Sequence, residues 1–177
     1  MAADYLISSL QPLTLDGPAP YTVAQFLEMC RDQLGARHAE ALAHLLGLGE
    51  AAADTPPAAA WRDLDAQLRN AVAAERARAR GADPAKWRRP VDGCSLYWAG
   101  RVQAAFQEKD PGKRDRLLDQ VWWDAAGELT PAASPLSAAA AYTYGLRLAR
   151  TVRRQALSPE AGNQVFDDLT AATKLEF

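Results

Sequence analysis

Apolar residues recur every three or four positions through most of this chain, the spacing that places them on one face of an α-helix. Thr22 and Gln25 have the spacing of a capping box, and Gly35 and Gly81 each follow the last apolar residue of a helical stretch. The pattern predicts helices over residues 22–34, 37–46, 58–80, 96–106, 111–129, 135–156 and from 159 onward.

Three dipeptides, Asp110-Pro111, Ser134-Pro135 and Ser158-Pro159, place an N-cap residue directly before a proline, which is a start signal for a helix. With an alanine-rich composition, they predict an all-α fold, a compact bundle of about six helices. The segment Tyr5–Leu10 is too short for periodicity to decide between a helix and an extended conformation. We expect one domain over residues 1–177, with division into 1–49 and 58–177 at a proline-containing linker as an alternative.

Arginines form two stripes on the predicted helices. Arg62, Arg69, Arg76 and Arg80 are separated by 7, 7 and 4 residues, next to an apolar row that contains Trp61, Leu64, Leu68 and Val72. Arg147, Arg150 and Arg154 lie opposite a face of small residues in the segment 135–156. Trp122 and Trp123 point about 100° apart on a helix, so that one can fill the core while Trp123 meets a second surface.

The arginine stripes have three interpretations: a solvated face with local ion pairs, a nucleic-acid site, or a protein interface. The segment Arg76–Arg89 contains six cations and one anion, which favours nucleic acid, whereas the net charge of −2 opposes it. Arginine binds carboxylates at two points, which favours a protein interface. We therefore predict an interface at Arg62, Arg69, Arg76, Arg80, Arg147, Arg150, Arg154 and Trp123, with nucleic-acid binding by Arg76–Arg89 as the alternative.

No motif for catalysis, a cofactor or a metal is recognisable. His38 and His44 are six residues apart, which separates them on a helix, and Cys30 and Cys94 belong to no metal motif. We expect a protein that is not an enzyme and holds no cofactor; the rival interpretation is a pocket lined by Trp, Tyr and Glu75. Without an apolar run of membrane-spanning length or a signal-peptide pattern, we expect a cytoplasmic location.

Several motifs follow one another along the chain. They are Tyr5-Leu6-Ile7-Ser8-Ser9-Leu10-Gln11-Pro12, Gln25-Phe26-Leu27, Leu68-Arg69-Asn70 and Glu75-Arg76-Ala77 between Trp61 and Gly81, Asp110-Pro111, Leu118-Asp119, Trp122, and Tyr142 with Leu146 and Leu148. The order of these motifs resembles a family of short uncharacterised proteins encoded in bacterial V-type ATPase operons. That family in turn is similar to the C/d subunit of V-type ATPases. The resemblance implies a non-catalytic coupling subunit or assembly factor, with the central stalk and the rotor ring as partners. Through these partners it also implies a peripheral location at the cytoplasmic face of the inner membrane.

Overall fold

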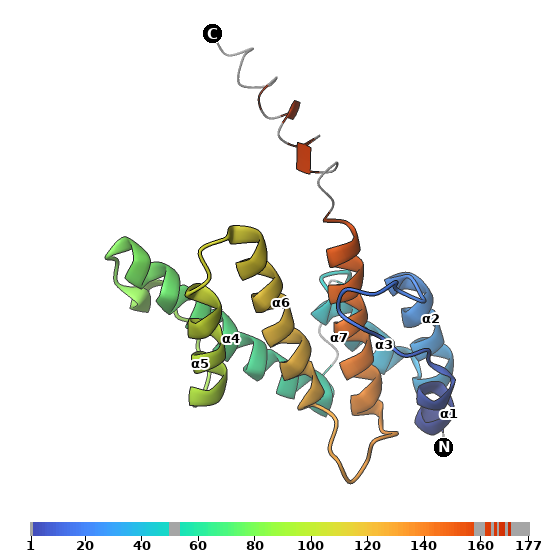
Figure 1. Ribbon diagram of the computed structural model, residues 1–177. Helices are drawn as coiled ribbons and strands as arrows, with labels where there is room; N and C mark the ends of the chain where they lie inside the picture. The colour runs from blue at the N-terminus through green and yellow to red at the C-terminus, as the bar shows by residue number, and fades with distance from the viewer. Residues whose placement is uncertain are drawn as a thin grey trace.

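The computed structural model describes residues 2–49 and 54–157, together with residues 162, 163, 165, 167, 168 and 170. In these residues the chain forms seven α-helices and one 3-10 helix, with no strand, which confirms the prediction of an all-α fold (Figure 1). The elements are α1 (Ala2–Ser9), α2 (Val23–Leu34), α3 (Ala36–Leu45), α4 (Pro56–Arg80), η1 (Pro84–Trp87), α5 (Leu96–Phe106), α6 (Pro111–Gly127) and α7 (Ala138–Gln155). The segment Tyr5–Leu10, which the sequence left open, is helical up to Ser9.

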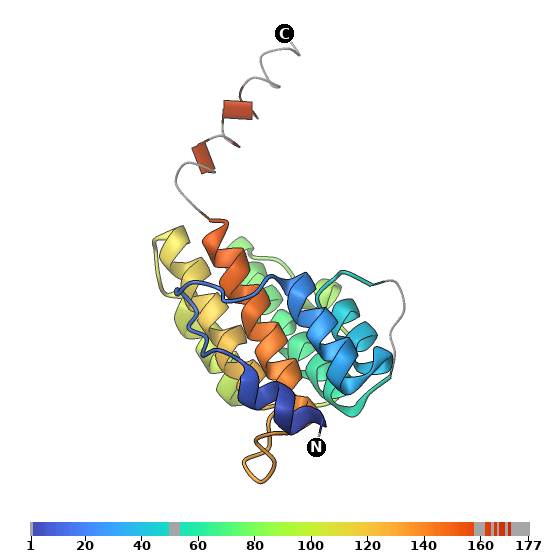
Figure 2. The same cartoon turned by 90° about the vertical axis from the view of Figure 1, so that its right-hand side faces the viewer.

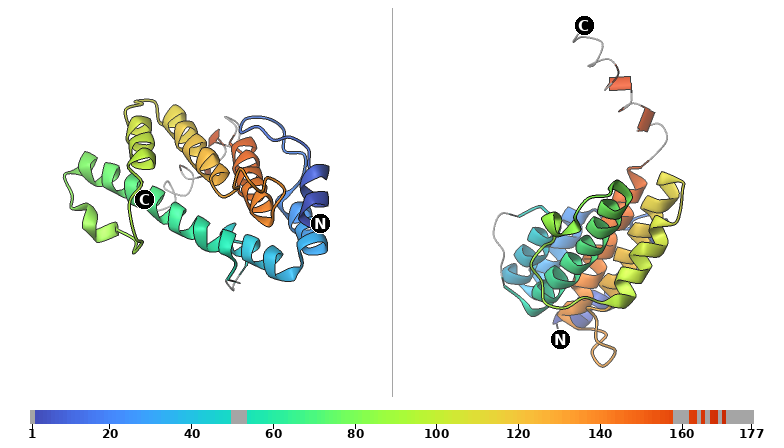
Figure 3. Two further views of the ribbon diagram at one scale, coloured as in Figure 1. Left: turned by 90° about the horizontal axis from the view of Figure 1, so that it is seen from below. Right: turned by 90° about the vertical axis from the view of Figure 1, so that its left-hand side faces the viewer.

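Helix α7 is the centre of the arrangement, because it contacts α1, α2, α3, α4 and α6. Seen from below, α5, α6 and α7 stand side by side, and the 25-residue helix α4 runs along them on the other side (Figure 3, left). The loop 10–22 crosses α7 on its outer side (Figure 2). Its backbone carbonyls accept hydrogen bonds from Tyr144, Thr151 and Gln155 of α7.

One hydrophobic core joins the N-terminal helices to the rest of the described chain. It includes Leu6 of α1, Phe26 of α2, Leu42 of α3 and Leu68 of α4, all of which are buried. Tyr142 of α7 is also buried, and its hydroxyl bonds the Thr55 hydroxyl at 2.9 Å and donates to the His38 carbonyl at 3.1 Å. Burial of this apolar surface supplies most of the driving force for folding, while the hydrogen bonds satisfy the buried phenol.

Two predicted helix starts are wrong by a few residues. The prolines 56 and 57, which the sequence pattern assigned to a linker, form the first turn of α4, and the Thr55 hydroxyl accepts from the Ala58 amide. The helix predicted from Pro135 begins at Ala138 instead. The Ser134 amide donates back to the Pro131 carbonyl at 2.9 Å and closes a turn, and Leu136 remains 41% exposed, so a helical turn here would bury nothing. The start predicted at Ser158 lies outside the described residues.

Gly145 allows α7 to approach α2 and α3 closely. A Cβ atom on Gly145 would lie 2.8 Å from Leu42 Cδ2 and 2.9 Å from Phe26 Cε1, closer than real side chains allow. Gly100 in α5 is the opposite case, because a Cβ atom there would meet nothing within 4 Å. Both glycines lie inside α-helices, and they differ in whether neighbouring side chains pack against them.

We expect Gly145→Ala to lower the free energy of unfolding by about 1–3 kcal/mol, because the added methyl overpacks the core. Gly100→Ala is the matched control and should raise it by up to about 1 kcal/mol, because alanine is the better helix former. Urea unfolding followed by circular dichroism measures both. An unchanged or increased free energy of unfolding in Gly145→Ala would show that α7 does not need the close approach at Gly145.

Candidate functional site

A groove of about 620 Å³ opens between the C-terminal half of α4, the segment around η1, the N-terminal half of α6 and the end of α7. Six arginines and two aspartates line it, above an apolar floor. The lining residues are Arg69, Val72, Ala73, Arg76, Ala77, Arg80, Trp87, Arg89, Asp115, Leu118, Asp119, Trp122, Arg150 and Arg153. Arginine is in excess, so the groove favours an anionic occupant.

Three of these arginines have no anionic partner among the described residues. Arg76, Arg80 and Arg89 are exposed, and their guanidinium groups make no ion pair or hydrogen bond within that part of the chain. Arg69, by contrast, donates from Nε to Asp65 at 2.5 Å. Like charges that converge on one groove repel one another, so an anion bound between them would be stabilised.

Asn70 determines how Arg89 reaches the groove. Its side-chain amide donates to the Arg89 carbonyl at 3.0 Å and accepts from the Arg89 amide at 2.7 Å. Asp83 begins η1 by accepting from the Ala85 amide at 2.9 Å. The segment that follows α4 is thus folded back along that helix and adds Arg89 and Trp87 to the same groove.

Trp87 is a site residue that the sequence analysis missed. It is 54% exposed and lies in the groove wall, where an aromatic ring can stack on a ligand. The signal was present in the sequence as Lys86-Trp87-Arg88-Arg89, an aromatic residue inside a cationic run.

The opposite wall is built on Asp119 of α6, which is only 2% exposed. Its carboxylate accepts from Arg150 at 2.9 Å, from Arg153 at 2.5 Å and from Arg154 at 3.4 Å. A buried carboxylate is tolerated when it is paired and hydrogen-bonded, so these arginines are required by the fold. The helical pattern did not indicate that Asp119 is buried, because an aspartate in an amphipathic helix normally lies on the solvent face.

A continuous series of contacts runs beneath the groove and joins its walls. Asp65 of α4 accepts from Arg69 and from the Trp122 indole, the latter at 2.8 Å. The Arg150 guanidinium lies 5.3 Å from the centre of the Trp122 ring and bonds Asp119. Helices α4, α6 and α7 are thereby linked at the base of the groove.

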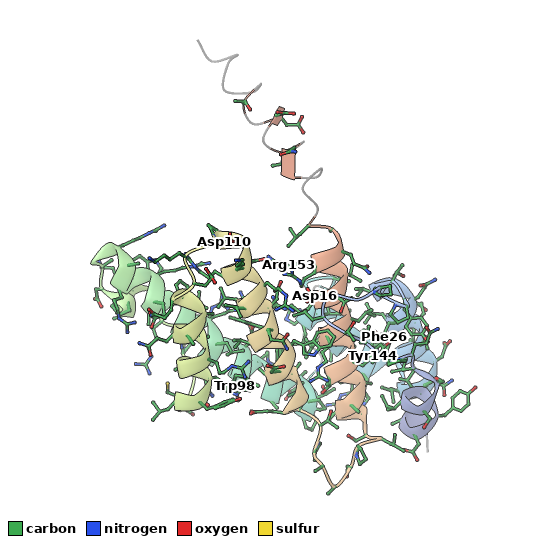
Figure 4. The ribbon with its side chains drawn as sticks, viewed as in Figure 1. Asp16, Phe26, Trp98, Asp110, Tyr144 and Arg153 are labelled. Carbon is green, nitrogen blue, oxygen red and sulfur yellow. The ribbon has the colours of Figure 1, made fainter. Side chains whose placement is uncertain are left out.

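Arg154 connects Asp119 to the N-terminal loop, because it bonds both Asp119 and Asp16. Asp16 accepts from Arg154 at 2.7 Å and from Arg116 at 2.5 Å. The hydrogen bonds from Arg154 and then Arg116 lower the pKa of the Asp16 carboxyl below its usual value. Arg153 and Asp16 lie near the C-terminal end of α7 (Figure 4).

The structure brings four of the predicted interface residues together in the groove: Arg69, Arg76, Arg80 and Arg150. Arg62 lies outside it and pairs with Asp54 at 3.1 Å. The predicted stripe on α4 is therefore divided into a local ion pair near the start of the helix and a groove wall near its end.

The second predicted face, with Arg147, Arg150 and Arg154, is largely engaged inside the protein. Arg147 donates from Nε to the Trp123 carbonyl at 3.0 Å and stacks over the Trp123 ring. Burial lowers the pKa of Arg147. Trp123 is only 9% exposed, so the expectation that it meets a second surface is wrong. The reason is that α6 packs against α7, whose Arg147 covers the Trp123 ring.

The rival enzyme interpretation depended on Glu75 in a pocket. The Glu75 carboxylate instead bonds Arg78 at 2.5 Å, and Glu75 lines neither the groove nor a smaller pocket of about 250 Å³ between α1, α6 and α7. His38 lies against Tyr142, and His44 bonds the Gly49 carbonyl. In the described parts of the chain, no group of histidine, cysteine, aspartate and glutamate side chains is arranged to hold a metal ion.

Comparisons with family models, with curated proteins and with solved structures returned no significant match to this chain. Among the described helices, none is long and apolar enough to cross a membrane.

Asp119→Asn should lower the free energy of unfolding by about 3 kcal/mol, because it leaves three arginines without their shared buried carboxylate. Asp124→Asn is the control, since the Asp124–Arg101 pair is about one-third exposed on each side and should contribute less than about 1 kcal/mol. Urea unfolding compares them. Equal effects would show that Asp119 acts as an ordinary surface charge.

The stability contributed by Asp16 should depend on pH. Its pKa is lowered in the folded state, so the contribution is present above the unfolded pKa and is lost as the pH falls through the folded pKa. Asp16→Asn should therefore cost less than about 1 kcal/mol at neutral pH, and the difference from the unsubstituted protein should be smaller at a pH well below the ordinary aspartate pKa of about 3.9. Urea unfolding at both pH values tests this, and an equal difference at low pH would contradict it.

Proposed function

We propose that the protein is a non-catalytic binding protein of a bacterial V-type ATPase, a coupling subunit or an assembly factor that docks an acidic surface of its partner in the arginine groove. The observation that carries the proposal is the convergence of Arg76, Arg80 and Arg89 on one groove without an anionic partner among the described residues.

The chemistry of the groove supports a carboxylate-bearing protein surface. Guanidinium groups bind carboxylates through two parallel hydrogen bonds and are less strongly hydrated than ammonium groups, so they suit interfaces. The groove also contains Trp87 and the edge of Trp122, and tryptophan and arginine are the residues most enriched among energetic hot spots of interfaces.

The choice of partner rests on the resemblance of the sequence motifs to proteins of V-type ATPase operons and to the C/d subunit. In this proposal the central stalk or the rotor ring supplies the acidic surface. The protein would then work in the cytoplasm, and its association with the membrane would depend on its partner.

A pull-down from native membranes and cytoplasm, followed by mass spectrometry, tests the proposal. The unsubstituted protein should recover stalk and ring subunits, and Arg76→Glu/Arg80→Glu should recover at least about tenfold less. Arg31→Glu/Arg88→Glu changes the net charge equally at exposed positions outside the groove and should leave recovery intact. Both variants should melt within a few degrees of the unsubstituted protein, because exposed substitutions change stability little.

Failure of the unsubstituted protein to recover any V-type ATPase subunit would contradict the choice of partner. Equal losses in the groove variant and the control variant would contradict the choice of site.

Nucleic acid is the second candidate occupant, and the exposure of Trp87 between Lys86 and Arg88 is the observation that favours it. Bases stack on exposed aromatic rings, and basic grooves follow the phosphate backbone. Binding of a single-stranded oligonucleotide, measured by anisotropy, should then fall steeply with salt and weaken on Trp87→Ala. No binding at about 50 mM salt would remove this candidate.

A further inference from the structure

We propose that the groove receives a short amphipathic α-helix of the partner, with its acidic stripe against the arginines of α4 and its apolar stripe against α6. This inference rests on the proposed function, because it specifies the form of the acidic segment that the groove binds. It follows from three features of the groove. These are the spacing of the residues on the α4 face, the apolar residues of α6, and the hydrogen bonds that the backbone around the groove already makes.

The part of α4 that lines the groove is a single helical face. Its residues are Arg69, Val72, Ala73, Arg76, Ala77 and Arg80, at separations of 3, 4, 7, 8 and 11 from the first. This is the pattern by which one helix normally packs against another. The face extends for about 16 Å along the axis. Arg69, Arg76 and Arg80 form the central row of this face, with Val72 on one side of the row and the small residues Ala73 and Ala77 on the other.

Helix α6 supplies the facing surface. Leu118 and Trp122 are four residues apart, so they lie on one face of α6, and both line the groove. The groove thus has two helical walls with apolar residues at helical spacing. The bound segment spans about three helical turns, the length of the α4 face, and the groove of about 620 Å³ takes the side of it that faces α4 and α6.

The backbone around the groove excludes a bound strand. An extended peptide needs a partner with free amides and carbonyls, as an exposed sheet edge provides. The walls on α4, α6 and α7 are helices whose backbone groups are bonded internally, and in the segment after α4 the amide and carbonyl of Arg89 are both bonded to Asn70. A helix satisfies its own backbone hydrogen bonds and requires only side-chain contacts from the groove.

The distribution of charge sets the orientation of the bound helix about its axis. Asp115 on the α6 side is partly exposed, although it is paired with Arg153 at 3.1 Å, and it would repel a second carboxylate. On the α4 side, Arg76 and Arg80 are one turn apart, and Arg69 lies two turns before Arg76. Glutamates four and seven residues apart on the partner would match these positions, with leucines turned towards Leu118 and Trp122.

Two labelled synthetic peptides of about 16 residues test the inference, since shorter isolated helices form poorly. The first places glutamates at the matching positions beside a leucine stripe; the second has the same composition in an order that destroys the helical stripe. With the full-length protein, anisotropy should show binding at least about tenfold tighter for the first peptide, and circular dichroism should show a gain of helix in the mixture.

Two substitutions test whether the peptide binds in the groove. Arg76→Glu should weaken binding of the first peptide by at least about tenfold, whereas Arg88→Glu, outside the groove, should have little effect. Ala73→Phe retains every arginine but fills the space above the floor, and it should abolish binding while thermal unfolding remains cooperative. If the first peptide binds Ala73→Phe as tightly as the unsubstituted protein, the inference that a helix binds in the groove is wrong.

The outcomes separate this inference from the proposed function. If both peptides bind equally and both depend on Arg76, the groove binds acidic chains of any form, so the inference fails and the proposed function stands. If neither peptide binds although the pull-down depends on Arg76 and Arg80, the partner is not a helix, and the inference fails alone. If neither peptide binds and the pull-down is also empty, both fail.

Discussion

The buried carboxylate of Asp119 is the constraint on which the arrangement of charges in this protein depends. A carboxylate that is only 2% exposed requires cationic partners, and three arginines of α7 provide them. This requirement fixes the rotation of α7 against α6. Arg154 also bonds Asp16, so the same group of charges holds the N-terminal loop against α7.

The same constraint separates structural arginines from those that remain for binding. Arg150 and Arg153 line the groove, but Asp119 and Asp115 hold their guanidinium groups. Arg76 and Arg80, near the end of α4, have no such carboxylate among the described residues. The groove therefore combines a neutralised wall on α6 and α7 with a cationic wall on α4, and this asymmetry allows it to orient an amphipathic ligand.

The groove is also held rigidly at its base. Asp65, Trp122, Arg150 and Asp119 join α4, α6 and α7 by hydrogen bonds and one cation–π contact. A site that is formed before binding loses little entropy on binding, which suits a protein that links two parts of a larger assembly. The proposed role as a coupling subunit or assembly factor requires such a preformed site and no catalytic group.

The sequence by itself determined most of the secondary structure, because helix formation responds to local signals. The capping box of Thr22 and Gln25 begins α2, and Asp110-Pro111 begins α6, both as expected. Helix α4 ends at Gly81, whose backbone adopts the left-handed conformation that favours glycine. The arginine stripe on α4 was also visible, since residues on one helical face are set by the helical period alone. The start of α7 was misplaced because a turn closed by Ser134 competes with the cap.

Only the tertiary structure decided which arginines are neutralised. Asp16 and Arg154 are 138 residues apart, and Asp119 and Arg150 are 31 apart, so no local pattern pairs them. The same holds for Trp123, whose burial depends on the helices around α6, and for Trp87, which the Asn70–Arg89 hydrogen bonds bring to the groove. A charge acts as a binding group or a structural group according to its spatial neighbours, and only the tertiary structure brings those neighbours together.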